Sequence, residues 1–210
     1  MRLSYSILTH NEGESIETLL SFLVEFKDLD DEIVVVDDYS DDELTLQILK
    51  DYQSNKHIKL FQRALNKDFA SQKNFLMSKC TGDYIFNIDA DELPKPDLIV
   101  NLKGILELNS DIELYAVPRE NTVDGLTEQH IKKWGWNVDD NGFVNFPDYQ
   151  YRLMKRLPDI KWAGHVHERP SSNTRKLSVG VIPDEFALEH HKSISRQEQQ
   201  NNFYNSISIS

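Results

Sequence analysis

The sequence predicts an α/β domain built on a mostly parallel β-sheet with helices on both faces. Short apolar runs that are typical of buried strands alternate along the chain with segments whose apolar residues recur at helical spacing. The chain has 210 residues, of which 39% are hydrophobic and 28% charged, as expected for one folded domain with its own core.

The elements can be assigned in order along the chain. Strands are expected at residues 3–8, 32–36, 57–61, 84–88 and 112–117, and further strands at 150–156 and 178–182. Helices are expected at residues 14–27, 44–52, 69–80 and 97–108, and a polar helix at about 193–205. The stretch 119–150 is polar and punctuated by glycine, so we expect an irregular insertion there.

Charge and cysteine content exclude several classes of partner. The net charge of −12 argues against nucleic acid and against an anionic bilayer, since both attract basic surfaces. Cys80 is the single cysteine, which rules out an intrachain disulfide and favours a reducing, cytoplasmic location. We find neither a signal peptide nor an apolar run of about 20 residues that a membrane span needs, so we expect at most peripheral membrane association.

Polar segments follow three of the predicted strands, where ligands of open parallel sheets bind. In Asp89-Ala90-Asp91, two carboxylates at a strand end can converge on a hard cation such as Mg²⁺ or Mn²⁺, although a solvated turn would also explain them. Asp38, after the second strand, can accept a hydrogen bond from a nucleoside, or the acidic run around it can serve turn and helix-capping chemistry. A diphosphate ligand would need such a cation, because the chain itself is strongly acidic.

Four stretches of the chain form an ordered set. They are Ile7-Leu8-Thr9-His10-Asn11-Glu12, residues 33–41 with Asp37-Asp38-Tyr39-Ser40-Asp41, residues 66–74 with Lys73-Asn74, and residues 82–92 with Asp89-Ala90-Asp91-Glu92. Taken in this order, they resemble the family 2 glycosyltransferases with the GT-A fold. The resemblance covers residues 3–118. Residues 151–156, 162–168 and 189–193 are similar to the bacterial lipopolysaccharide-core-type branch of that family.

The resemblance implies a division of labour along the chain. Within one domain spanning 1–210, residues 1–118 would bind the nucleotide-sugar donor, and residues 119–210 would form a smaller acceptor-side lobe. The donor, UDP-linked by family habit, would lie against the following residues: Thr9, Asn11, Glu12, Asp38, Lys73, Asp89 and Ala90. Lys73 stands where the family usually has arginine. Lysine lacks the planar fork with which arginine binds a diphosphate or ribose at two points.

The resemblance also implies how the reaction would run. Asp91 would ligate Mn²⁺ or Mg²⁺ directly, Asp89 would face the ribose or the metal, and His190 or His191 would complete the metal shell. Glu168 would act as general base on a hydroxyl of a glycan or lipid-linked glycan acceptor, which predicts inversion at the anomeric carbon.

Aromatic side chains gather in the acceptor half. His165 and His167 would orient Glu168 or contact the acceptor. Trp134 and Trp136 can stack on sugar rings of the acceptor, or they can belong to the core of a small lobe.

Three other functions stay open at this stage. A nucleotidyltransferase can share this sheet, but its glycine-rich, basic phosphate loop is not matched by the acidic loop at residues 9–14. A non-catalytic module that binds a nucleotide sugar or carbohydrate is opposed by the presence of Asp89, Asp91 and Glu168. A metal-dependent phosphate-ester hydrolase would differ from a transferase by not requiring an acceptor.

Overall fold

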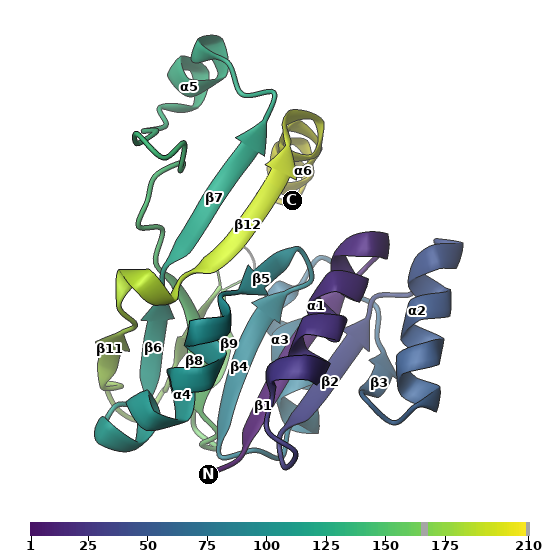
Figure 1. The fold of residues 1–210 in the computed structure, drawn as a ribbon, viewed down its shortest axis with the longest axis vertical. Coiled ribbons are helices and arrows are strands. Elements are labelled where there is room, and N and C mark those ends of the chain that lie inside the picture. Colours follow the sequence, from purple (N-terminus) through teal and green to yellow (C-terminus); the bar gives the residue numbers. More distant parts are fainter. Residues whose placement is uncertain (165–167, 209–210) are drawn as a thin grey trace.

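The centre of the protein is a seven-stranded sheet, seen in a computed structural model that describes residues 1–164 and 168–208 (Figure 1). Its strands are, in chain order, β1 (Leu3–Thr9), β2 (Glu32–Asp37), β3 (Lys59–Gln62), β4 (Tyr84–Asp89), β6 (Leu114–Val117), β8 (Gln150–Lys155) and β11 (Val179–Val181). In space the order is β11-β6-β8-β4-β1-β2-β3. Only β8 runs antiparallel to its neighbours, β4 and β6. The predicted mostly parallel sheet is therefore confirmed.

Helices cover both faces of this sheet and bury two separate cores. The four helices of the N-terminal half are α1 (Gly13–Phe26), α2 (Glu43–Ser54), α3 (Phe69–Lys79) and α4 (Pro96–Leu108). On β2, Ile33 and Val35 pack into the core under α1, α2 and α4, whereas Val34 and Val36 pack into the core under α3. Because side chains of a strand alternate between faces, a continuous apolar run feeds both cores at once.

A second, smaller sheet rises from the carboxyl end of the first (Figure 1). It consists of β5 (Glu92–Pro94), β12 (Leu188–Ser193) and β7 (Arg119–Asp124), and α5 (Glu128–Trp134) follows β7 at its far end. The prediction of an irregular insertion at 119–150 is thus wrong for the first part of that stretch, which forms β7 and α5. β7 has no apolar alternation and is held by parallel pairing with β12, which lies 69 residues further along the chain.

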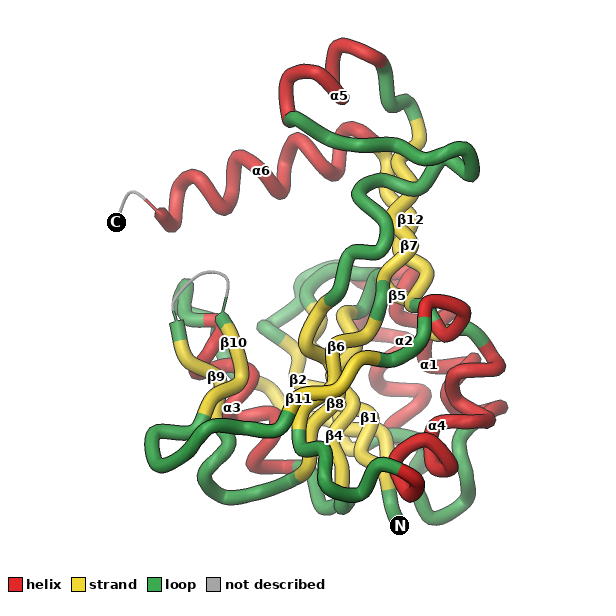
Figure 2. Tube along the Cα trace, turned by 90° about the vertical axis from the view of Figure 1, so that its left-hand side faces the viewer, coloured by secondary structure: helices red, strands yellow, loops and turns green. Residues whose placement is uncertain are grey.

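A hairpin and the C-terminal helix complete the surroundings of the large sheet's carboxyl end. The hairpin of β9 (Lys161–Ala163) and β10 (Arg169–Ser171) lies beside α3, where the Asn74 amide exchanges two hydrogen bonds with the backbone of Trp162. A short 3₁₀ helix, η1 (Asp184–Phe186), precedes β12. Helix α6 (Ile194–Ser208) then leaves the end of β12 and extends away from the sheet (Figure 2).

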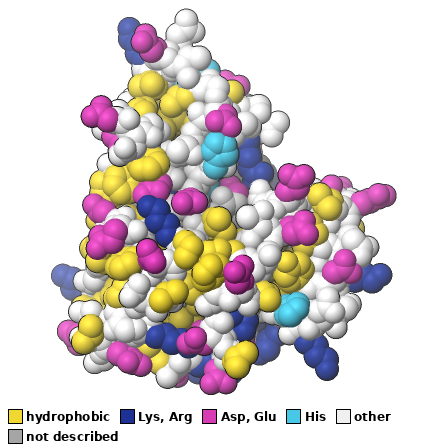
Figure 3. Space-filling view, in the orientation of Figure 1, with side chains coloured by type: hydrophobic (Ala, Val, Ile, Leu, Met, Phe, Trp, Pro, Cys, Tyr) yellow, Lys and Arg dark blue, Asp and Glu magenta, His cyan; other side chains and the backbone are white. Residues whose placement is uncertain are grey.

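The surface agrees with the acidic composition. Asp and Glu side chains are scattered over the face in Figure 3, with Lys and Arg between them. Within the two described ranges, none of the helices combines the length and the apolar character that a membrane crossing requires.

Candidate active site

The site is a cleft of about 1430 Å³ at the carboxyl ends of β1, β2 and β4. The register of the parallel strands sets Thr9 beside Asp37 and Leu8 beside Asp89, so the polar segments that follow these strands meet at one edge. Most of the predicted site residues line it, namely Thr9, Asn11, Glu12, Asp38, Lys73, Asp89, Ala90, Asp91, Trp136, Glu168 and His190. The cleft continues between the small sheet, the β9–β10 hairpin and the start of α6.

The loops after β1 and β2 form the first wall of the cleft and are tied to each other. The side-chain oxygen of Asn11 accepts the backbone N–H groups of Asp41 and Asp42, at 2.9 and 3.0 Å. Asp38 accepts the backbone N–H of Leu65 at 2.7 Å. Thr9 is only 4% exposed, and its hydroxyl has no hydrogen-bond partner among the described residues. A buried hydroxyl without a partner costs free energy, so the Thr9 hydroxyl is an unsatisfied polar group at the base of this wall.

Asp89 is held in place from below by a buried carboxylate. Glu92, whose side chain is fully buried, accepts the backbone N–H of Asp89 at 3.0 Å and a hydrogen bond from Arg152 Nη2 at 2.5 Å. The same Arg152 nitrogen donates to Asp89 Oδ2 at 2.5 Å. Burial alone would raise the pKa of Asp89, but the charges of Arg152 and Lys73 outweigh it and lower the pKa to about 2. Asp89 therefore stays ionised.

A chain of polar contacts leads from this buried carboxylate to His190. Arg119 donates to Glu92 at 3.1 Å and to Asp148 Oδ2 at 2.6 Å. Asn121 donates to the same Asp148 oxygen at 2.9 Å, and its own carbonyl oxygen lies 2.7 Å from His190 Nδ1. Because an amide oxygen only accepts, Nδ1 carries a proton, and the other ring nitrogen, Nε2, faces the cleft.

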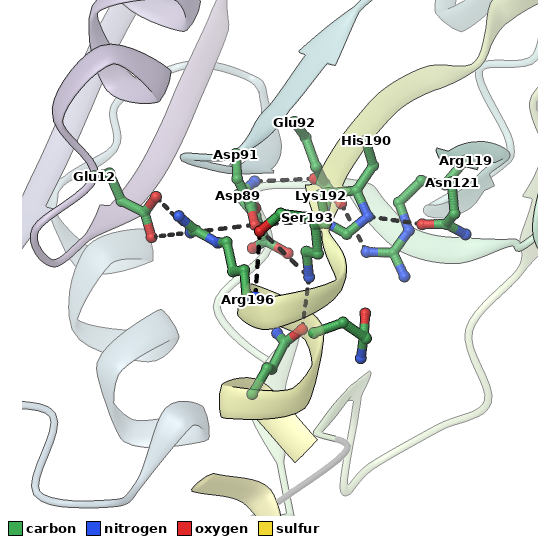
Figure 4. A network of polar contacts seen from close by, with 12 residues as sticks. Glu12, Asp89, Asp91, Glu92, Arg119, Asn121, His190, Lys192, Ser193 and Arg196 are labelled. Carbon is green, nitrogen blue, oxygen red and sulfur yellow. Dashed lines mark hydrogen bonds and ion pairs between the residues drawn. The ribbon is translucent and has the colours of Figure 1, made fainter. Parts of the chain in front are cut away.

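Asp91 is the point where several cationic groups converge (Figure 4). Its Oδ2 lies 3.3 Å from His190 Nε2, 3.5 Å from Arg196 Nη2 and 3.7 Å from Lys192 Nζ. Burial raises the pKa of Asp91, but the hydrogen bond and charge of His190 and the charges of Lys192 and Arg196 outweigh it, so the pKa lies well below its usual range. Burial lowers the pKa of Lys192.

The opposite wall carries Glu168 in an ion pair. Its Oε1 lies 2.5 Å from Lys73 Nζ, and both side chains are largely buried. The ammonium of Lys73 also lies over the ring of Trp162, 4.2 Å from its centroid. Trp162 Nε1 is buried without a hydrogen-bond partner among the described residues. Lys73, which the family resemblance placed on the donor, is thus bonded to the expected base.

The structure does not bring every predicted residue into the cleft. His191 lies on the other face of β12 from His190, where its ring contacts Thr122 and Asp124. Trp134 does not line the cleft; it stacks on His130 and packs against Trp136. His165 and His167 lie outside the described residues. Across the described part of the chain, no group of three or more His, Cys, Asp or Glu side chains is arranged to hold a metal ion.

Sequence reasoning missed several charged residues of this site. Arg152 lies within a stretch that carried the family resemblance, and Lys192 follows the two histidines, yet neither was assigned a role. Glu92 also lies in a stretch that carried the family resemblance, but neither Glu92 nor Arg119 was given a role, because their importance comes from burial that the sequence does not show. Arg196 lies in a polar segment that was predicted to be helical, but the sequence did not indicate which part of the fold this helix contacts.

Comparisons with known proteins agree with the geometry. Residues 4–174 match the family model described as Glycosyl transferase family 2. The SPbeta prophage-derived glycosyltransferase SunS of Bacillus subtilis is 26% identical over 176 residues, which cover 84% of this chain and 36% of SunS. The putative glycosyltransferase EpsE of the same organism is 38% identical over 97 residues, which cover 45% of this chain and 33% of EpsE. The chain thus spans about a third of the length of these curated relatives.

Solved structures extend the similarity to the fold. The crystal structure of S. aureus TarS 1–349 in complex with UDP-GlcNAc matches with a TM-score of 0.64 at 17% identity, covering 91% of this chain and 59% of that one. The likeness concerns the fold, and it confirms the GT-A arrangement expected from the four N-terminal stretches.

Proposed function

This chain belongs to glycosyl transferase family 2, and from that premise we propose that it transfers a sugar from a nucleoside-diphosphate sugar to a hydroxyl of a glycan acceptor. One observation carries the proposal: the polar ends of β1, β2 and β4 meet in a single cleft that also contains Glu168. TarS, which shares the fold, is described with UDP and with UDP-GlcNAc, and a UDP-linked donor is therefore our first choice.

The donor would enter along the β1 and β2 wall. The carboxylate of Asp38 offers an acceptor for the nucleoside, and a small shift of the Thr9 side chain, which also lines the cleft, would let its partnerless hydroxyl bond the same ligand. The diphosphate would then lie towards Asp89 and Asp91, where cationic side chains already gather.

A divalent cation fits the pair formed by Asp91 and His190. Oδ2 of Asp91 and Nε2 of His190 are 3.3 Å apart. When the ring is protonated, Nε2 donates a hydrogen bond to Asp91; when Nε2 has lost that proton, both atoms are acceptors and a metal cation can take the proton's place. The position of the proton on Nδ1 follows from Asn121, whose amide orientation is fixed by its bonds to Asp148 and to the carbonyl of Val144. Mn²⁺ or Mg²⁺ held there would offset the charge of the donor diphosphate.

Glu168 would serve as the general base. It would take the proton of the acceptor hydroxyl while that oxygen forms a bond to the anomeric carbon of the donor sugar. The bond from that carbon to the diphosphate breaks on the opposite side, which inverts the anomeric centre and releases the nucleoside diphosphate. Lys73 holds the Glu168 carboxylate in the cleft and keeps it next to a positive charge in the absence of substrate.

The direct test is calorimetric titration with UDP in the presence and absence of Mn²⁺, preceded by a thermal-shift screen of nucleotide sugars. Asp91→Ala should reduce Mn²⁺-dependent UDP binding by about a hundredfold, because it removes one of the two proposed protein ligands of the metal. Unchanged affinity would remove the metal from the proposal. Release of UDP from a UDP-sugar only when an acceptor glycan is added would separate a transferase from a hydrolase and from a non-catalytic module.

A further inference from the structure

Arg196, in the first turn of α6, bridges two walls of the cleft (Figure 4). Its Nη2 atom lies 2.6 Å from each carboxylate oxygen of Glu12 and 3.5 Å from Asp91 Oδ2. Glu12 follows β1 and Asp91 follows β4, so this single side chain spans the space between two elements that line the donor pocket.

The guanidinium of Arg196 has capacity for a further ligand. All of the contacts above use the same nitrogen, and Nε and Nη1 have no hydrogen-bond partner among the described residues. A guanidinium carries five N–H donors in a planar fork, which matches the oxygens of a phosphate. Its side chain is 41% exposed, so it can turn without unpacking a core.

Lys192 adds a second cation beside it. Its side chain is 6% exposed, its ammonium donates to the neutral Gln200 side chain at 2.6 Å, and the nearest carboxylate oxygen among the described residues, on Asp91, is 3.7 Å away. A buried ammonium usually has a close anion, because burial removes its hydration and an opposite charge compensates for that loss. An anionic ligand in the cleft would supply that partner.

We propose that Arg196 exchanges partners when the donor binds: it leaves Glu12 for the diphosphate of a nucleoside diphosphate, which it holds together with Lys192. The exchange also frees the Glu12 carboxylate to accept hydrogen bonds from the nucleoside. The start of α6 is thereby part of the donor site, and the partner of its Arg196 differs between the empty and the filled site. This inference rests on the proposed function, since it requires a nucleoside-diphosphate donor.

The experiment compares a ligand with phosphates and a ligand without them. UDP and uridine are titrated by calorimetry into the wild-type chain, Arg196→Met and Arg196→Lys, all with Mn²⁺. Arg196→Met should weaken UDP binding at least tenfold, because charge-assisted bonds to the diphosphate are lost. It should leave uridine binding unchanged or strengthen it, because Glu12 no longer has to be released. The UDP affinity of Arg196→Lys should lie between those of the wild type and Arg196→Met, since an ammonium keeps the positive charge but lacks the planar fork.

Arg175→Met is the matched control. Arg175 also bridges two carboxylates, Glu113 and Asp159, and is 39% exposed, but it does not line the cleft. This variant should bind UDP like the wild type, and its melting temperature shows what the loss of such a bridge does to folding alone.

The outcomes separate the two proposals. If the wild type binds UDP and Arg196→Met binds it equally well or more tightly, the exchange is wrong and Arg196 is only a structural bridge. If uridine binding falls as much as UDP binding, the loss is general and the exchange is also wrong. If the wild type binds neither UDP nor GDP, with or without Mn²⁺, the proposed function itself fails.

Discussion

The two ends of the central sheet both place carboxylates among cations, but they do so in different ways. At the amino end, Glu32 begins β2 and accepts hydrogen bonds from Ser4, Lys59, Arg2 and the backbone and side chain of Thr81. At the carboxyl end, Glu12, Asp89 and Asp91 face the cleft, and their partners come from β8, β12 and α6.

The origin of the partners explains the difference. The groups around Glu32 lie on or next to the strands that form the core, so their positions are fixed once the sheet is formed. The partners of Asp91 and Glu12 come from elements that pack against the cleft through polar side chains, and a ligand can displace them. The same chemistry therefore stabilises the fold at one end, whereas at the other end it surrounds the cleft in which we propose that the donor binds. Four substitutions test this comparison.

The largest effect is expected at the cleft, from Glu168→Gln. Sugar transfer should fall by about a thousandfold, since an amide cannot take the proton of the acceptor hydroxyl, while UDP affinity and melting temperature stay near those of the wild type. Steady-state rates with a glycan acceptor and UDP titration measure the two quantities.

Glu113→Gln is the control for this variant, because Glu113 is a similarly buried carboxylate paired with Arg175 away from the cleft. Transfer at a near wild-type rate in Glu168→Gln would place the base elsewhere and turn attention to Asp139, Asp140 or Asp148. Of these three, only Asp148 lines the cleft, and it is already bonded to Arg119 and Asn121.

Glu92→Gln should lower both stability, as expected for a change at the amino end of the sheet, and UDP affinity, as expected for a change at the carboxyl end. Glu92 is fully buried under the cleft, and its carboxylate accepts hydrogen bonds from Arg119, Arg152 and the backbone N–H of Asp89. Loss of its charge leaves the buried guanidinium of Arg152 and the partly buried one of Arg119 less compensated, so the free energy of unfolding should fall by about 3 kcal/mol. UDP affinity should fall as well, because Asp89 loses its support. Denaturant unfolding together with calorimetry checks this, and an unaffected UDP affinity would show that Asp89 is positioned without Glu92.

Glu32→Gln should affect stability alone. We expect a loss of about 2 kcal/mol in the free energy of unfolding at pH 7 and no change in UDP affinity. Burial raises the pKa of Glu32, but bonds from Lys59, Ser4 and Thr81 outweigh it and lower the pKa to about 2.

The pH dependence gives this variant a second readout. A carboxyl whose pKa is lowered by folding stabilises the native state above its ordinary value of 4.5, and loses that contribution as the pH falls towards about 2. The difference in unfolding free energy between the wild type and Glu32→Gln should therefore shrink over that range. A difference that is constant from pH 7 to pH 2 would contradict the assignment of the effect to the Glu32 charge.

The smallest effect is expected at the outer part of the cleft, from Trp136→Ala. If the indole stacks on an acceptor sugar, its loss should raise the KM for the acceptor about fivefold, equivalent to about 1 kcal/mol, without changing UDP affinity. Trp134→Ala is the matched comparison, since Trp134 does not line the cleft. Because Trp134 packs against Trp136, Trp134→Ala measures the cost of loosening that pair of rings. An acceptor contact by Trp136 predicts a larger rise in KM for Trp136→Ala, and equal effects would contradict that contact.

The pattern of apolar residues was sufficient to predict the large sheet. The continuous run in β2 and the helical spacing in α1 and α4 are local signals, and each predicted strand lies within a few residues of the observed one. β7 and β12 were not predicted, because Arg119–Asp124 contains a single apolar residue and Leu188–Ser193 buries a histidine and a lysine where apolar residues normally stand. Their pairing depends on a contact between distant segments, which periodicity does not report.

The sequence by itself determined the α/β alternation, the polar strand ends and the family, because these depend on residues that are close together in the chain. Only the tertiary structure decided which charges meet: Lys73 with Glu168, Arg152 with Asp89 and Glu92, and Arg196 with Glu12 and Asp91. The reason is physical. An ion pair needs its two groups within a few ångströms, and segments as far apart as residues 12 and 196 are brought that close only by the packing of the whole fold.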